Sequence, residues 1–343
     1  MNWDVLGHEW AVALLREHVA RNQARHAYLL CGPAGVGRRT LALRLAQALN
    51  CTQPLAPGEP CRVCRTCQQI ERMQHPDLAV VQAEQAGGTL KVDQVRDLQR
   101  SLALHPYEAR YRFALLLRFE EAHPSAMNAL LKTLEEPGPQ VILVLTAESP
   151  DVLLPTIVSR CEVLRLRPLP LEKLSQALQE RRGLSGDQAA LLAHLSGGRV
   201  GQALHLVDTP ALLDQRRIWL DEHARLLSAN RIERFLFADG LTKDKDREKE
   251  RETVRSILQT WGSLWRDVLL CAAGASAPLT NLDRYDEIER LAAHWGLDAA
   301  AQMLASLEQI QGLVDANINL RLAIEVLMLD LPYQLAGAFN SPG

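Results

Sequence analysis

Residues 26–50 constrain the fold more than any other part of the chain. A short apolar run, HAYLLC, leads into a glycine-rich loop, GPAGVG, and then into TLALRLAQALN, where Leu41, Leu45 and Leu49 recur at helical spacing. A strand, a glycine loop and a helix in this order are typical of a phosphate-binding loop, whose backbone N–H groups cradle phosphate oxygens. The pattern therefore predicts an α/β domain built on a parallel sheet.

Other apolar runs extend this pattern. DLAVVQA, RFALLL and VILVLTA are further strand candidates, and helical patterns such as VDQVRDLQRSLAL and AMNALLKTLEE separate them. Strands rich in Val and Leu that alternate with helices indicate a parallel sheet covered on both faces. We expect this α/β domain to occupy residues 1–167.

The remainder of the chain is predicted to be helical. Strand patterns stop after RLRPLPLEKL, and Pro168 and Pro170 mark a natural boundary. We expect a small helical domain over residues 168–208, broken by GLSG and SGGRVG, and a second helical domain over residues 209–343. Trp261 and Trp265 lie four residues apart, so they share one face of a helix.

Charge and hydropathy exclude several functional classes. The net charge is −3, from 38 basic and 41 acidic residues, so the chain has no overall attraction to nucleic acid. Any DNA contact is expected to be local or made by a partner. No apolar run approaches the roughly 18 to 20 residues of a membrane span, and the start, MNWDVLGHEW, is unlike a leader. We expect a cytoplasmic protein with no membrane contact.

The glycine loop departs from the working pattern GxxxxGK[ST] at its last two positions. Its candidate binding residues are Gly32, Gly35, Gly37, Arg38, Arg39 and Thr40. Arg38 stands where a compact lysine ammonium is wanted, and Arg39 stands where a hydroxyl would hold magnesium. Magnesium-dependent hydrolysis is therefore expected to be impaired. ATP or ADP binding on the backbone amides and helix dipole stays open, as does a loop without a ligand.

An acidic pair follows the predicted strand FALLL. Glu120 and Glu121 stand where an NTPase places an Asp for magnesium and a Glu that polarises the attacking water. Arg118 interrupts the end of this strand. A pair of ordinary surface glutamates is the alternative.

Four of the seven cysteines lie within 17 residues. Cys51, Cys61, Cys64 and Cys67 have the spacing C-x9-C-x2-C-x2-C. Thiolates bind zinc tetrahedrally, and four cysteine ligands indicate a closed structural Zn²⁺ site. Disulfides are disfavoured in the cytoplasm, so the alternative is a reduced, metal-free loop. The isolated Cys31, Cys161 and Cys271 are expected to be small core thiols.

Several strings together resemble the bacterial DNA polymerase III clamp loader, a branch of the AAA+ proteins. They are HAYLLCGPAGVGRRT, the four-cysteine segment, NALLKTLEEP within residues 127–137, PTIVSRCEVL at residues 155–164 and NINLRLAIEVLML at residues 317–329. The resemblance implies an AAA+ domain with a zinc module at residues 51–67, a helical lid over residues 168–208 and a helical collar over residues 209–343. It also implies a hetero-oligomer with gamma/tau and delta subunits, which acts on the sliding clamp and, as an assembled complex, on primed DNA.

Two kinds of subunit share these strings, the ATP-hydrolysing gamma/tau type and the delta-prime type. In the gamma/tau type the loop ends in Lys and a hydroxyl residue, and the lid carries a sensor arginine. Aligning GGRVGQAL by its final Ala and Leu puts Gly201 at that position. Arg199 is the alternative, but its direction around a helix differs by about 200°. The loop, acidic pair and lid all depart from the ATPase pattern, which favours a hydrolysis-deficient delta-prime subunit.

Arg160, in the string SRC, is the element that keeps the family pattern. The resemblance implies an arginine finger that reaches the γ-phosphate of ATP in a neighbouring subunit and stabilises the charge on the transferred phosphoryl group. A surface arginine in a salt bridge is the alternative. Two other functions stay open for the chain: an active gamma/tau-type ATPase in which arginine replaces lysine, and a zinc-stabilised interaction module outside replication.

Overall fold

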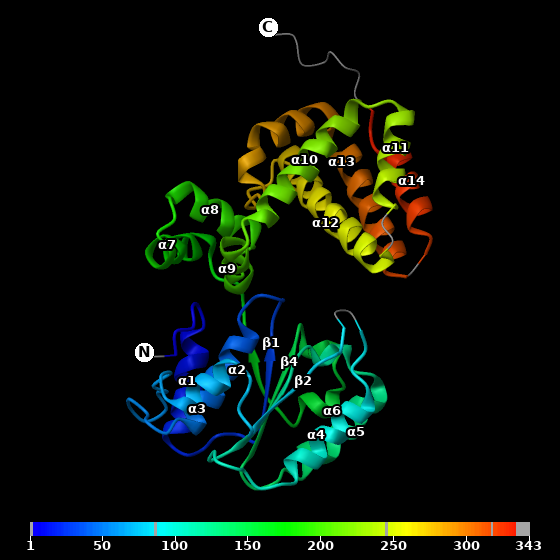
Figure 1. Cartoon of the computed structure of the whole chain (residues 1–343). Helices are drawn as coiled ribbons and strands as arrows, with labels where there is room; N and C mark the ends of the chain where they lie inside the picture. Colours follow the sequence, from blue (N-terminus) through cyan, green and yellow to red (C-terminus); the bar gives the residue numbers. More distant parts are fainter. Residues whose placement is uncertain (1–2, 86–87, 244–245, 317, 334–343) are drawn as a thin grey trace. The chain divides into compact units, whose positions relative to one another are not determined.

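A computed structural model of the protein describes residues 3–85, 88–243, 246–316 and 318–333. The chain divides into two compact units, residues 1–170 with 198–202, and residues 171–197 with 203–343 (Figure 1). The finer division into three domains at residues 167 and 208 stays a prediction. Among the described residues, no helix has both the length and the apolar character that crossing a bilayer requires.

The first unit contains a five-stranded parallel sheet with the strand order β2-β3-β4-β1-β5. Its strands are β1 (Ala27–Cys31), β2 (Leu78–Val81), β3 (Arg112–Leu116), β4 (Val141–Ala147) and β5 (Glu162–Arg165). The first four confirm the predicted strands, whereas β5 was not singled out from the sequence. In the centre of the sheet, Leu29 of β1 lies opposite Leu145 of β4 and Val163 of β5.

Helices cover both faces of this sheet, as predicted (Figure 1). They are α1 (Glu9–Ala20), α2 (Arg38–Asn50), α3 (Arg65–Glu71), α4 (Val92–Leu102), α5 (Pro124–Glu135) and α6 (Pro155–Val158), with short 3₁₀ turns η1 (Phe119–Glu121) and η2 (Pro150–Val152). Because side chains alternate along a strand, Tyr28 and Leu30 pack in the core with α1 to α3, while Leu29 and Cys31 pack in the core with α4 to α6. Both faces of β1 are buried.

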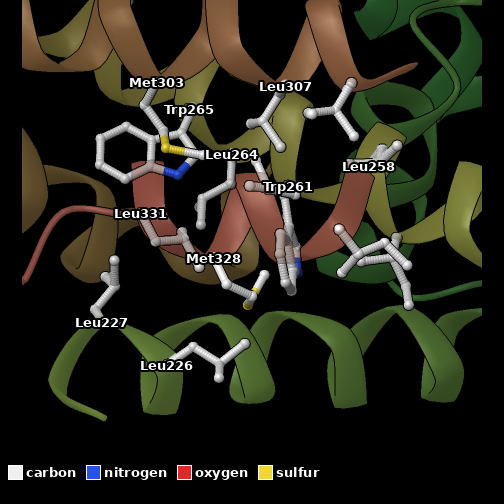
Figure 2. Close-up of a cluster of buried hydrophobic side chains, with 14 of the residues drawn as sticks. Leu226, Leu227, Leu258, Trp261, Leu264, Trp265, Met303, Leu307, Met328 and Leu331 are labelled. Atoms are coloured by element: carbon white, nitrogen blue, oxygen red, sulfur yellow. The ribbon is translucent and has the colours of Figure 1, made fainter. Parts of the chain in front are cut away.

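The second unit is helical. Its elements are α7 (Leu171–Arg182), α8 (Gly186–Leu195), α9 (Val200–Asp208), α10 (Ala211–Ser228), α11 (Arg231–Leu241), α12 (Arg247–Ala272), the 3₁₀ turn η3 (Leu282–Arg284), α13 (Tyr285–Asp315) and α14 (Leu320–Asp330). The first residues of α9 belong to the first unit. Trp261 and Trp265 of α12 are fully buried, among side chains of α10, α13 and α14 (Figure 2). The predicted shared face of these tryptophans is therefore the core of this unit.

Candidate functional site

The glycine loop connects β1 to α2 at the carboxyl edge of the sheet, where parallel α/β sheets bind their ligands. Gly32, Gly35 and Gly37 have φ angles of 149°, 80° and 112°, which residues with a side chain rarely adopt. A Cβ atom on Gly32 would lie 2.5 Å from the carbonyl oxygen of Leu166. The glycines are therefore required by the backbone, whether or not the loop binds phosphate.

The structure brings the arginine at the lysine position together with the acidic pair. Arg38 and Glu120 are buried or nearly so, and their Nη1 and Oε1 atoms lie 3.8 Å apart. Among the described residues, Arg38 Nη1 and Glu120 Oε2 have no hydrogen-bond partner. Burial raises the pKa of the Glu120 carboxyl, and the Arg38 charge opposes this shift only in part.

The second acidic residue also faces an arginine. Glu121 Oε1 lies 2.9 Å from Nε of Arg118, the residue that interrupts the end of the preceding strand. Arg39 and Thr40 are exposed at the start of α2. Each glutamate is therefore paired with a guanidinium, and the two residues after Arg38 do not join them.

Two further contacts close around the loop, and the sequence did not predict them. The ring Nε2 of buried His8 lies 2.9 Å from the carbonyl oxygen of Val36. The backbone N–H of Gly201 donates to the carbonyl oxygen of Gly35 at 2.7 Å, and a Cβ on Gly35 would meet Gln202 at 3.1 Å. Gly201, the residue aligned with the sensor arginine, thus contacts the loop through its backbone.

The four cysteines converge as the spacing predicted. The sulfur atoms of Cys51, Cys61, Cys64 and Cys67 all lie within 4.8 Å of one another. Backbone N–H groups of Cys61, Cys64 and Cys67 donate to the sulfur of the preceding cysteine in the cluster, at 3.2 to 3.5 Å. Zinc bonds of about 2.3 Å place tetrahedral sulfurs about 3.8 Å apart, so small shifts suffice to bind an ion. The residues fit a closed four-thiolate metal site.

The surroundings of the sulfurs act in opposite directions on their pKa values. Burial raises the pKa of the Cys51 and Cys67 thiols. Burial also opposes ionisation of Cys64, but hydrogen bonds from Thr52 and from the Cys67 N–H outweigh it and lower the Cys64 pKa to about 6. A thiolate at Cys64 is the ionisation state that a metal ligand requires.

Polar side chains of α2 anchor this cluster to the helix behind the glycine loop. Arg44 is buried and forms an ion pair with Glu71 of α3, and this pairing lowers the pKa of Glu71 against the opposing effect of burial. Gln47 donates from Nε2 to the carbonyl oxygen of Cys67 at 2.7 Å. In the sequence, the signal of these contacts is a pair of polar residues three positions apart in a largely apolar helix.

Arg160 lies just after α6 and is paired within its own chain. Its Nη2 atom lies 2.7 Å from Oε1 of Glu135, the last residue of α5, and its Nη1 atom donates to the carbonyl oxygen of Thr156 at 2.8 Å. The side chain keeps 34% of its surface exposed. The salt bridge that the sequence left as an alternative is present, and the role of Arg160 toward a neighbouring subunit stays a prediction.

Comparison with known proteins finds similar DNA polymerase III subunits. The family described as DNA polymerase III, delta subunit, matches residues 7–170. The DNA polymerase III subunit delta' of Pseudomonas aeruginosa is 41% identical over 203 residues, which span 57% of this chain and 60% of that relative. Subunit delta' of Bacillus subtilis is 28% identical over 318 residues, or 93% of this chain and 94% of the relative. The chain is therefore similar to DNA polymerase III subunits of the delta-prime type.

Relatives of the gamma/tau type are also similar to this chain. The tau subunit of Escherichia coli DNA polymerase III is 33% identical to it over 210 residues, which span 60% of this chain and 32% of tau. The solved structure of a gamma subunit-related protein from Thermotoga maritima has a TM-score of 0.54 and 15% identity, covering 93% of this chain and 97% of that one. This structural likeness supports the fold alone.

Proposed function

We propose that this chain is a delta-prime subunit of the DNA polymerase III clamp loader, which assists ATP-dependent loading of the sliding clamp onto primed DNA without hydrolysing ATP itself. Its likeness to subunit delta' along 93% of the chain and to tau supports a place beside gamma/tau and delta subunits in a cytoplasmic hetero-oligomer. The proposed organisation is an AAA+ domain, a lid and a collar.

The ion pair between Arg38 and Glu120 is the observation that carries the hydrolysis-deficient assignment. Magnesium in a working site needs a free carboxylate and a hydroxyl, and the phosphates need a compact cation. Here Glu120 faces Arg38, Glu121 faces Arg118, and Thr40 is exposed. These residues do not fit a magnesium–triphosphate complex.

The loop amides are still available to ATP or ADP in this proposal, but with little side-chain support. Residues 201 and 202 lie against Gly35, and neither Gly201 nor Gln202 carries a positive charge. A bound nucleotide would therefore lack the cationic lid contact expected of an ATPase. The four-cysteine cluster would hold structural Zn²⁺, which stabilises the segment 51–67 and contributes no chemistry at the loop.

Arg160 supplies the contribution to catalysis in this proposal. A guanidinium that reaches a neighbouring subunit's γ-phosphate neutralises charge in the transition state, and such fingers contribute roughly 10³ to 10⁵ in rate. The exposed position of Arg160 at the end of α6 supports this role, because a finger must be accessible to a partner.

The competing function is an active ATPase of the gamma/tau type, favoured by the 33% identity to tau. ATP turnover separates the two. The isolated chain is expected to show none above background, and Arg160→Ala is expected to slow turnover by a loader reconstituted with gamma/tau and delta subunits. Robust magnesium-dependent turnover by the isolated chain would establish the competing function.

A further inference from the structure

The contacts of Arg160 hold its guanidinium at two points. Glu135 Oε1 contacts Nη2 at 2.7 Å, and the carbonyl oxygen of Thr156 accepts from Nη1 at 2.8 Å. Because the two acceptors bind different nitrogens of one rigid plane, they restrict both its position and its rotation. The two acceptors come from different helices, α5 and α6.

Local helix electrostatics do not explain a carboxylate at Glu135. The carboxyl end of a helix carries a partial negative charge, which favours lysine or arginine over glutamate. Glu135 is the last residue of α5 and is followed by a second acidic residue, Glu136. The 2.7 Å contact with Arg160 provides the compensating positive charge.

Fold stability does not explain the pair either. Glu135 is half exposed and Arg160 is one third exposed. Ion pairs at such positions contribute little to the free energy of unfolding, because water screens them and two long side chains must be ordered. The consequence of the ion pair therefore lies in how it holds the guanidinium of Arg160, not in the stability of the fold.

The paired guanidinium keeps donors for a further anion. Arginine has five N–H groups, and Glu135 and Thr156 engage one each, which leaves three. A phosphate oxygen can therefore bind without displacing Glu135. A guanidinium held in advance loses less conformational entropy when it meets the phosphate.

We infer that Glu135 is a positioning residue for Arg160, holding the guanidinium in the orientation in which it meets a phosphate of the neighbouring subunit's nucleotide. The inference rests on the proposed function, in which Arg160 acts in trans. It adds a residue that contacts neither the nucleotide nor the reacting atoms.

Steady-state ATP turnover by the reconstituted loader tests this inference. Glu135→Gln is expected to lower kcat about 3- to 10-fold with an unchanged KM, less than Arg160→Ala, because the finger is present but less well oriented. Glu136→Gln is the matched control. It removes the same charge at the next position along the chain, where the side chain has no described contact to Arg160, and it should leave kcat unchanged.

A double variant distinguishes positioning from a general structural effect. If Glu135 acts through Arg160, Glu135→Gln changes nothing further in the Arg160→Ala background. Gel filtration should show that all variants still assemble. Two results would overturn the inference and leave the role of Arg160 in trans intact. One is a wild-type kcat for Glu135→Gln when Arg160→Ala slows the loader. The other is an equal loss of kcat on adding Glu135→Gln to the wild-type and to the Arg160→Ala protein. Wild-type turnover by Arg160→Ala overturns the proposed role of Arg160 in trans and, with it, the inference.

Discussion

Arg38 Nη1 lies 3.8 Å from Oε1 of Glu120, with only 9% and 20% of the two side chains exposed. The two residues come from the start of α2 and from the turn after β3, so they meet at the carboxyl edge of the sheet. A guanidinium thus lies beside the carboxylate where an ATPase would bind magnesium. The interaction between these two side chains can be measured as a change in the free energy of unfolding when one or both are substituted.

Glu120→Gln is expected to lower the free energy of unfolding by about 1–3 kcal/mol, because it leaves Arg38 buried without a counter-charge. Urea denaturation of the isolated chain measures the loss. The double variant Arg38→Met/Glu120→Gln should recover most of it. Glu121→Gln, whose partner Arg118 is 41% exposed, should cost less than 1 kcal/mol. Equal losses for both glutamates would contradict a special buried pair.

The four-cysteine cluster is expected to bind about one zinc ion per chain, measured by metal analysis of freshly purified protein. Cys64→Ser should lose the metal and lower the melting temperature, because the ion joins segments that otherwise depend on a few hydrogen bonds. Cys271→Ser in α12, outside the cluster, is the control and should keep the metal. Purified wild-type protein without any bound metal would refute the site.

Arg234 is expected to be a major stabilising residue of the helical unit. Its buried guanidinium donates at 2.6 to 3.3 Å to the carbonyl oxygens of Leu226, Leu227, Met328, Leu331 and Pro332. Arg234→Met should lower the free energy of unfolding by about 3 kcal/mol or more, since several buried carbonyls lose their donor. Arg231→Met, at the exposed start of the same helix, should change it by less than about 0.5 kcal/mol in the same denaturation experiment.

His223 is expected to make stability depend on pH. Burial, with a smaller effect of the Arg234 charge, lowers the pKa of His223 from 6.5 to about 3, and its Nε2 accepts from Trp265 Nε1 at 2.9 Å. Below pH 6.5, His223 binds a proton in the unfolded chain but stays neutral in the folded chain. The stability contributed by neutral His223 is therefore complete above pH 6.5 and is lost as the pH falls, at about 1.4 kcal/mol per pH unit.

Comparison with His223→Gln isolates this contribution, because glutamine can accept from Trp265 but does not titrate in this range. Between pH 6 and pH 4 the wild-type free energy of unfolding should fall more steeply than that of the variant. Parallel curves for the two proteins would show that His223 is not held neutral in the fold.

Much of the fold could be predicted from the spacing of apolar residues along the sequence. Four of the five strands and the helices on both faces of the sheet followed from runs of apolar residues and their spacing. The missing strand, β5, is four residues long with mixed polarity, and its place beside β1 depends on hydrogen bonds with that strand. A short edge strand carries too few residues for its own pattern to identify it.

The sequence by itself determined the glycine loop between a strand and a helix, the convergence of Cys51, Cys61, Cys64 and Cys67, and the buried face that contains Trp261 and Trp265, because near neighbours along the chain set these features. Only the tertiary structure decided that Arg38 faces Glu120, that Arg160 is held by Glu135, and that Gly201 contacts Gly35. These partners are distant in sequence. Their pairing depends on how strands and helices pack, and no local periodicity encodes that.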